Sequence, residues 1–151
     1  MEMTGEQLIA LPQAATWEAL NDPEILKDCI PGCETIERIA DNEYELTMTA
    51  KVGPVNAKFK GKMTVSEADP PRAYTLVFEG QGGVAGFAKG RASVALTPQD
   101  AGTRLAYTAK AAVGGKLAQV GARLIDGVAK KLADQFFTAF NKRVSGKTGD
   151  Q

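Results

Sequence analysis

The C-terminal part of the chain constrains the fold most, because it contains the one long amphipathic helix that the sequence predicts. Residues 114–144 contain no proline and are rich in Ala, Leu, Lys and Gln. Polar and charged residues occupy one side of this segment, with Asp126 four residues before Lys130. A helix of this length would be about 40 Å long, enough to cross a small domain. Its other side carries apolar residues at three- and four-residue steps, namely Leu117, Val120, Leu124, Val128, Leu132, Phe136 and Phe140.

Gly121 lies near the middle of the apolar side of this predicted helix. A helix that packs on a core normally has a large aliphatic side chain at such a position, and glycine costs about 1 kcal/mol of helix propensity relative to alanine. We therefore expect either a strand backbone close to Gly121 or a hollow beside it.

The middle of the chain has the two-residue period of β-strands. From Tyr44 to Val52 every second residue is apolar, and the pattern resumes after a turn at Gly53-Pro54. Further turn sequences at 69–71 and 100–102 separate the later strands. Strict alternation with short turns predicts an antiparallel sheet of six or seven strands, with one apolar face and one solvated face.

The N-terminal segment predicts one strand followed by two short helices. Residues 2–9 form the strand, and a helical pattern with Trp17 on its inward side follows. Asp22 can cap the second helix, Pro23 can take its first position, and Pro31-Gly32 ends it. With the sheet and the final helix, this order gives an α+β helix-grip fold in which a curved antiparallel sheet grips the long C-terminal helix. We expect one domain over residues 1–144 and a disordered polar tail over 145–151.

A single helix cannot fill the concave face of so wide a sheet, so the arrangement predicts a cavity between them. Its lining would include many small residues, namely Ala50, Ala57, Gly61, Ala109, Ala111 and Gly121. The residues that we expect to contact a bound ligand are Trp17, Met48, Phe59, Met63, Phe78, Phe87, Tyr107, Gly121, Leu124, Ile125 and Val128. Two of these assignments have simpler alternatives: Trp17 as an anchor of the first helix in the core, and the apolar side of the last helix as ordinary core.

The composition excludes several classes of function. Eighteen basic and eighteen acidic residues cancel, so the chain has no overall field that would attract nucleic acid. No basic segment followed by an apolar one marks a secretory signal, no apolar run is long enough to span a bilayer, and two cysteines suit a reducing compartment. We therefore expect a cytoplasmic protein.

Histidine is absent, which excludes histidine-based acid–base catalysis, Ser-His-Asp triads and histidine metal sites. Cys29 and Cys33 lack the further ligands of a closed zinc site. We interpret them as two small buried hydrophobic residues, with a disulfide between them left open. We expect no catalytic residue and no metal site.

The stretch GQGGVAGFAKG at residues 80–90 lacks the Gly-Lys-Ser/Thr ending of a phosphate-binding loop, and it opens a strand. We interpret its glycines as a bulge or bend at a sheet edge that leaves Phe87 near the mouth of the cavity.

Lys58, Lys60 and Lys62 alternate with the apolar residues of one strand and so lie on its outer face. Such a stripe is usually only solvated surface. The alternative is a patch that docks on anionic lipid or on a partner, where each lysine adds about 1 kcal/mol.

Several separate motifs, in order along nearly the whole chain, resemble the family of the G subunit of carbon monoxide dehydrogenase. They are the segments 29–34 (CIPGCE), 52–55 (VGPV), 57–61 (AKFKG), 86–90 (GFAKG), 113–119 (VGGKLAQ) and 124–127 (LIDG). The resemblance implies a START-like, SRPBCC helix-grip protein that serves a molybdenum-containing carbon monoxide dehydrogenase or a related hydroxylase. It further implies a quinone or lipid-like ligand and a peripheral place on the inner face of the membrane. Many members have a C-terminal extension with a hydrophobic or linker segment; this sequence ends in a polar segment, so we expect no membrane anchor of its own.

Three hypotheses follow. The first is a non-catalytic carrier that buries a long apolar molecule between sheet and helix, for which burial of ten or so carbons supplies several kcal/mol. The second is a START-like enzyme of the cyclase or hydratase type, which needs an acid or base that points inward. The acids that can be placed from the sequence fall on solvated faces, namely Glu45, Glu67, Glu79 and Asp126. The third is a pure assembly or docking factor whose cavity is incidental.

Overall fold

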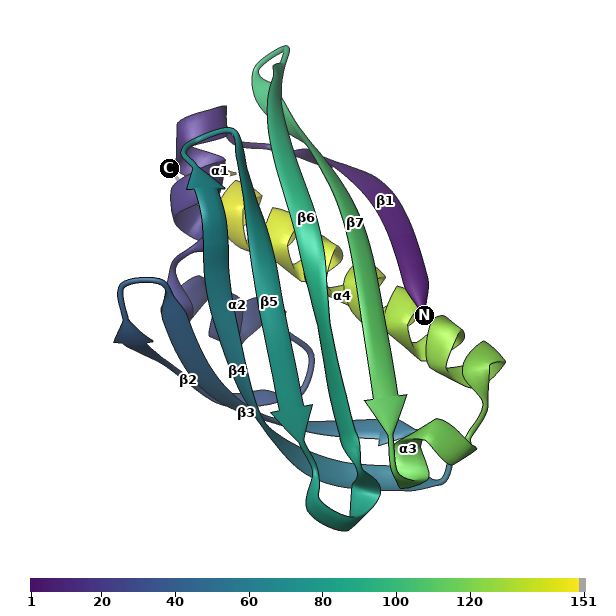
Figure 1. Ribbon diagram of the computed structural model, residues 1–151. Coiled ribbons are helices and arrows are strands. Elements are labelled where there is room, and N and C mark those ends of the chain that lie inside the picture. The colour runs from purple at the N-terminus through teal and green to yellow at the C-terminus, as the bar shows by residue number, and fades with distance from the viewer. Residues whose placement is uncertain (150–151) are drawn as a thin grey trace.

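The structure, a computed structural model, describes residues 1–149 as an α+β fold of seven strands and a long C-terminal helix (Figure 1). The strands are β1 (Glu2–Ile9), β2 (Cys33–Ala40), β3 (Glu43–Val52), β4 (Val55–Asp69), β5 (Ala73–Gln81), β6 (Phe87–Gln99) and β7 (Gly102–Gly114). The helices are α1 (Gln13–Leu20), α2 (Pro23–Cys29), the 3-10 turn η1 (Gly83–Ala85), α3 (Lys116–Gln119) and α4 (Ala122–Gly149).

The strands form one sheet in the order β1-β7-β6-β5-β4-β3-β2, and every neighbouring pair is antiparallel. The sheet curls around α4, which crosses one face of it from the end near α3 to the end near α1 (Figure 1). We call the face toward α4 the inner face. The predicted antiparallel sheet of six or seven strands, its long final helix and the two short helices after the first strand are therefore confirmed.

The two short helices begin as the sequence indicates. The Asp22 carboxylate accepts a hydrogen bond from the backbone N–H of Glu24 at 2.9 Å, and Pro23 takes the first position of α2. The Trp17 ring is half-buried and meets the Tyr74 ring edge to face, with 5.1 Å between the ring centroids. Trp17 therefore anchors α1 to the core, which is the simpler of the two interpretations given for it above.

The helix predicted over residues 114–144 is interrupted, and this part of the prediction is wrong. β7 extends to Gly114, the short helix α3 follows, and α4 begins only at Ala122. Gly121 has φ +97°, a left-handed conformation that favours glycine and ends the helical hydrogen-bond pattern. Gly121 thus lies in an exposed break between two helices instead of facing the sheet.

The backbone of α4 is helical to Gly149, so no break in the chain marks the domain end expected at residue 144. The tail expected over 145–151 stays a prediction, and its residues 150 and 151 lie outside the described part of the chain.

The buried apolar residues form two separate core clusters. The first core cluster lies at the α1 and α2 end, where Phe140 and Val144 of α4 pack with Leu20, Tyr44 and Leu105. The second core cluster lies at the α3 end and consists of the buried residues Val52, Phe59, Ala85 and Leu117. The core is therefore divided along the length of α4.

Candidate functional site

Short side chains from four neighbouring strands adjoin one another on the inner face of the sheet. Gly61 of β4 pairs with Gly80 of β5, which pairs with Ala88 of β6. Further along β6, Gly90 pairs with Ala111 of β7 and Ala92 pairs with Ala109. We call this set the small-residue floor; its members are Gly61, Gly80, Ala88, Gly90, Ala92, Ala109 and Ala111.

The floor lies partly uncovered between the two core clusters. Ala109 is buried, but the other six residues remain half-buried although they face α4. A Cβ built on Gly80 would meet no atom within 4 Å. Above the floor, Leu132 is four residues from both Val128 and Phe136 on the same side of α4, yet it packs with neither cluster. We call this part of the inner face, where the floor residues keep accessible surface beneath α4, the central gap.

Aromatic side chains border the central gap. The Phe78 ring lies along the floor, because a Cβ built on Gly90 would be 2.8 Å from it. The Tyr107 ring stacks on Phe137 of α4, with 5.5 Å between centroids and 25° between planes. Burial, with a smaller effect of Asp134, raises the pKa of the Tyr107 phenol, so its hydroxyl stays a neutral hydrogen-bonding group at physiological pH.

The sheet side of the central gap carries no charge. The described residues that face inward from β3 to β7 include no Asp, Glu, Lys or Arg. Glu45 and Glu79 lie on the outer face, where both adjoin Lys62 in the register. Glu67 and Asp126 are exposed. The expected placement of these four acids on solvated faces is confirmed.

The structure distributes the predicted ligand-binding residues between the two clusters and the gap. Phe59 is buried in the second core cluster, with Met48 and Val128 packed against it. Trp17, Met63 and Tyr107 pack against the first core cluster. Phe78 belongs to neither, and it is the predicted aromatic residue that lies on the floor itself.

Leu124 and Ile125 occupy the first turns of α4. Leu124 is 38% exposed, and its Cδ2 atom is 2.6 Å from a Cβ built on Gly53, so it covers the turn between β3 and β4. Ile125 is half-buried and packs with neither cluster. Whether either residue contacts a ligand stays a prediction.

Phe87 does not lie at the mouth of the gap. It pairs with Gln81 and Gly114 on the outer face, whereas the next residue, Ala88, faces inward. Of the expected bulge or bend, the structure has the bend, because Gly82, Gly83 and Gly86 belong to the turn around η1. From Phe87 on, β6 keeps a regular register, so alternation turns Phe87 outward. Its ring is 37% exposed and covers Gly114.

Sequence reasoning missed four members of the floor, namely Gly80, Ala88, Gly90 and Ala92. Their signal was a small residue at every second position of residues 88–92, the period of one strand face. The pattern was overlooked because these residues were interpreted as part of a bulge or bend. Of the predicted small lining residues, Gly61, Ala109 and Ala111 belong to the floor, whereas Ala50 and Ala57 pack against the second core cluster.

The lysine stripe lies on the outer face of β4, as expected. Lys58 pairs with Glu34 at 2.9 Å and Lys62 with Glu43 at 3.5 Å. Hydrogen bonds from Lys58 and then Thr49 lower the pKa of Glu34. Lys60 has no ion-pair partner among the described residues. Two of the three lysines are thus locally neutralised, and docking through this stripe stays a prediction.

The two cysteines are free. Cys29 is buried in the first core cluster and Cys33 is half-buried. Burial raises the pKa of both thiols, which keeps them protonated and poorly nucleophilic. This agrees with their interpretation as small hydrophobic residues. No group of three acidic, cysteine or histidine side chains that could hold a metal occurs in the described part of the chain.

Two shallow hollows lie elsewhere on the molecule. One, of about 630 Å³, is on the outer face of the sheet over Thr75, Ser93, Ala95, Ala106 and Thr108. The other, of about 640 Å³, lies along the exposed side of α4 from Gly127 to Lys142. Neither hollow is lined by a residue of the small-residue floor. Within residues 1–149, no helix has the length and hydropathy needed to cross a membrane.

Comparison with known proteins gives a family and a fold. The family profile described as the G subunit of carbon monoxide dehydrogenase (CoxG) matches residues 5–145. A solved structure of a conserved protein from Geobacillus kaustophilus is 34% identical, with a TM-score of 0.90, and the match covers 97% of this chain and 96% of that one. No curated protein sequence matches significantly.

Two more distant structures share the fold. A START superfamily protein from Mycobacterium smegmatis is 13% identical, with a TM-score of 0.73 and coverage of 96% and 97% of the two chains. The aromatase/cyclase ZhuI from a Streptomyces species is 14% identical, with a TM-score of 0.69 and coverage of 98% and 95%. These likenesses confirm the predicted START-like helix-grip fold.

Proposed function

Because the chain belongs to the CoxG family, that of the G subunit of carbon monoxide dehydrogenase, we propose that it is a non-catalytic accessory protein that carries a long apolar molecule in the central gap. The observation that carries this proposal is the small-residue floor, which faces α4, bears no charge and keeps accessible surface. Core positions of this kind are normally packed to high density. An uncharged, incompletely filled inner surface is what an apolar guest would complete.

The proposed guest is a quinone or a lipid-like molecule. Each CH2 group that moves from water onto the floor contributes about 0.8 kcal/mol, so a tail of about ten carbons would supply several kcal/mol. The neutral Tyr107 hydroxyl, which lies over Gly5 of β1 beside the floor, could donate one hydrogen bond to a carbonyl head group. Few such polar contacts would leave binding reversible, which suits a carrier.

The proposed partner is a molybdenum-containing carbon monoxide dehydrogenase or a related hydroxylase. The description of the family names a component of carbon monoxide dehydrogenase. In this proposal the protein moves the apolar molecule between that enzyme and the cytoplasmic face of the membrane. It would act there as a peripheral protein.

An enzymatic role is the second candidate, favoured by the aromatase/cyclase that shares the fold at 14% identity. A cyclase or hydratase needs an acid or base that reaches its substrate. The inward-facing surface described above offers only tyrosine hydroxyls, and burial raises the pKa of both Tyr74 and Tyr107. This lining favours the carrier. A pure docking factor with an incidental gap is the third candidate.

The experiment is native mass spectrometry of the protein purified from its own cells without detergent, with solvent extraction of the same sample. The carrier predicts a bound species that extraction identifies as a quinone or lipid. The Gly80→Leu variant, which fills the gap, should lack that species. A wild-type protein that carries no apolar species, even after incubation with decylubiquinone, would overturn the carrier.

A further inference from the structure

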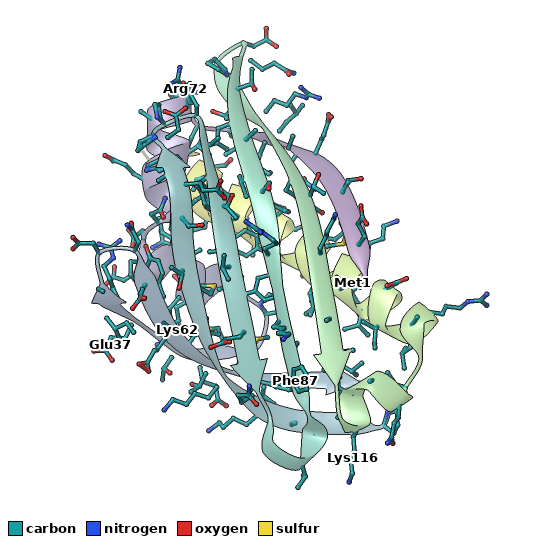
Figure 2. All side chains as sticks on the ribbon, in the orientation of Figure 1. Met1, Glu37, Lys62, Arg72, Phe87 and Lys116 are labelled. Atoms are coloured by element: carbon teal, nitrogen blue, oxygen red, sulfur yellow. The ribbon has the colours of Figure 1, made fainter. Side chains whose placement is uncertain are left out.

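Three segments far apart in the sequence meet at the end of the molecule beyond the second core cluster. The turn between β3 and β4 meets α4, since a Cβ on Gly53 would be 2.6 Å from Leu124 Cδ2. The loop that contains η1 meets the start of α3, since a Cβ on Gly115 would be 2.6 Å from the Cα of Gly86. Figure 2 places Phe87 and Lys116 at this end and Arg72 at the opposite one. We call this surface the loop end.

The tip of the loop end is apolar and open to solvent. Val84, in the middle of η1, is 85% exposed, more than the other exposed large hydrophobic residues of the described chain. Phe87, which follows η1 at the start of β6, is 37% exposed, and Leu124 of α4, beside the turn between β3 and β4, is 38% exposed. An aliphatic side chain held so far out on a short loop contributes little to the fold and is free to enter a contact.

The loop end is also free of acidic residues, although the whole chain has no net charge. None of the eighteen acids falls in residues 51–60, 80–90 or 113–125, the segments that meet there. Of its exposed cations, Lys58 pairs with Glu34 and Lys89 lies opposite Glu79 in the register. The other four, Lys51, Lys60, Lys116 and Arg123, have no ion-pair partner in the described part of the chain. The nearest acid along α4 is Asp126.

The helix geometry strengthens this positive field. Arg123 lies in the first turn of α4, which contains no acid. A cation at a helix N-terminus is unfavourable because the macrodipole is positive there. The chain therefore concentrates positive charge at the loop end at a cost to α4, which indicates an anionic partner.

We propose that the loop end docks on an anionic lipid bilayer, with Val84 entering the interface and the four cations contacting the head groups. This inference rests on the proposed carrier function, because it assigns the surface through which the carrier meets its lipid source. A lone aliphatic tip surrounded by spaced cations suits a fluid surface, whereas a protein partner would need a matching cavity for Val84. The surface differs from the lysine stripe, which contributes only one unpaired cation to it, Lys60.

Docking in this way would place the second core cluster against the membrane. Leu117 and Ala85 of that cluster come from α3 and η1, the two elements that contact each other at the loop end. Gly115 and Gly121, on either side of α3, both have positive φ, 72° and 97°. The four-residue helix α3 at the loop end is thus bounded by a glycine with positive φ at each of its ends.

The test is flotation of the full chain with vesicles of phosphatidylcholine, with and without about one quarter phosphatidylglycerol. Val84→Asp should lower the partition coefficient to the anionic vesicles about tenfold or more, because it removes a buried aliphatic group. Its matched control is Leu8→Asp, at an apolar side chain 63% exposed on β1, which should leave binding within about twofold of wild type. Equal binding by the Val84 variant and wild type would overturn the proposal.

The cations are tested in the same assay. The double variant Lys60→Gln/Lys116→Gln should bind the anionic vesicles roughly 30-fold more weakly, since each lysine contributes about 1 kcal/mol. Lys130→Gln/Lys131→Gln makes the same charge change on the exposed side of α4 and should have little effect. Loss of binding in the control alone, or equal binding of wild type to neutral and anionic vesicles, would contradict docking through the loop end.

Binding of decylubiquinone in vesicle-free solution separates this inference from the proposed function. Val84→Asp should retain wild-type affinity for decylubiquinone while it loses the vesicles. If wild type floats with anionic vesicles but binds no decylubiquinone, the carrier proposal fails and the docking surface stands. If wild type binds decylubiquinone but never floats, the docking surface fails and the carrier stands.

Discussion

Filling the central gap from the sheet side should block binding of an apolar ligand without damage to the fold. Gly80 is the position for this change, because a Cβ there meets no atom within 4 Å and its backbone φ is not in the left-handed region. Its neighbours in the register are the equally small Gly61 and Ala88. A leucine at Gly80 would therefore rise from the floor into the space under α4.

The expected loss of affinity follows from the size of the new side chain. Leucine adds four carbon atoms, which exclude about four CH2 groups of a ligand tail. At about 0.8 kcal/mol for each group, the variant loses about 3 kcal/mol of binding free energy, or roughly a hundredfold to several hundredfold in Kd. The free energy of unfolding should stay the same or rise, because the side chain covers half-exposed apolar surface and replaces a strand glycine.

The assay is isothermal titration with decylubiquinone, alongside urea denaturation of each variant. The matched control is Gly127→Leu, which adds the same side chain at another glycine with no atom within 4 Å of its Cβ, on the exposed side of α4. The control should bind like wild type. A Gly80→Leu protein that is folded and still binds with wild-type affinity would refute the placement of the ligand on the floor.

Three further predictions concern the scaffold around the site. Gly90→Ala should lower the free energy of unfolding by about 1–3 kcal/mol in urea denaturation, because its Cβ would collide with the backbone carbonyl oxygen of Lys110 in β7. An unchanged urea midpoint would mean that β6 and β7 lie farther apart than described. Burial, and then the neighbouring Tyr44, raises the pKa of Tyr74, so the folded protein keeps this proton at pH values where the unfolded chain releases it. Stability from Tyr74 is complete below about pH 10 and should fall by about 1.4 kcal/mol by one pH unit above that value. When the two proteins are compared by denaturation at pH 9 and 11, the loss of stability should be smaller by about this amount in Tyr74→Phe; equal losses would contradict the buried hydroxyl. Asp22→Ala should cost about 1 kcal/mol through the lost cap of α2, and a thermal midpoint equal to that of wild type would count against the cap.

The Gly121→Leu substitution, which a helix through this glycine would suggest as a probe, is unsuitable. Gly121 has φ +97°, where a leucine backbone is strained whatever the space around it. A loss of ligand in that variant would report altered helix ends as readily as a filled gap. Gly80 provides the same test without backbone strain.

Local signals in the sequence were sufficient to predict the fold. Alternation from Tyr44 to Val52 and the Asp22-Pro23 cap each act over a few residues, and both depend on chemistry that the sequence displays directly. The helical period of residues 117–140 is equally clear, but it does not reveal that Gly121 adopts a left-handed backbone. Period and propensity describe side-chain faces, whereas a break in a helix depends on one φ angle.

The site was harder to predict because it is a property of the register between strands. The floor arises only when Gly61 is set beside Gly80, and Gly80 beside Ala88, across three strands. No single strand shows that adjacency. Phe87 illustrates the same limit, since one extra residue in a bulge would have turned it inward and the regular register turns it outward.

The most direct test of the central claim is an NMR titration of the protein, labelled at its alanine methyl groups, with decylubiquinone. The account predicts shift changes and ligand contacts at the four alanines of the floor, Ala88, Ala92, Ala109 and Ala111, which face α4. Ala95 and Ala106 line the hollow on the opposite face of the same strands and should stay unchanged. Shift changes at Ala95 and Ala106, with none at the four alanines of the floor, would contradict the account.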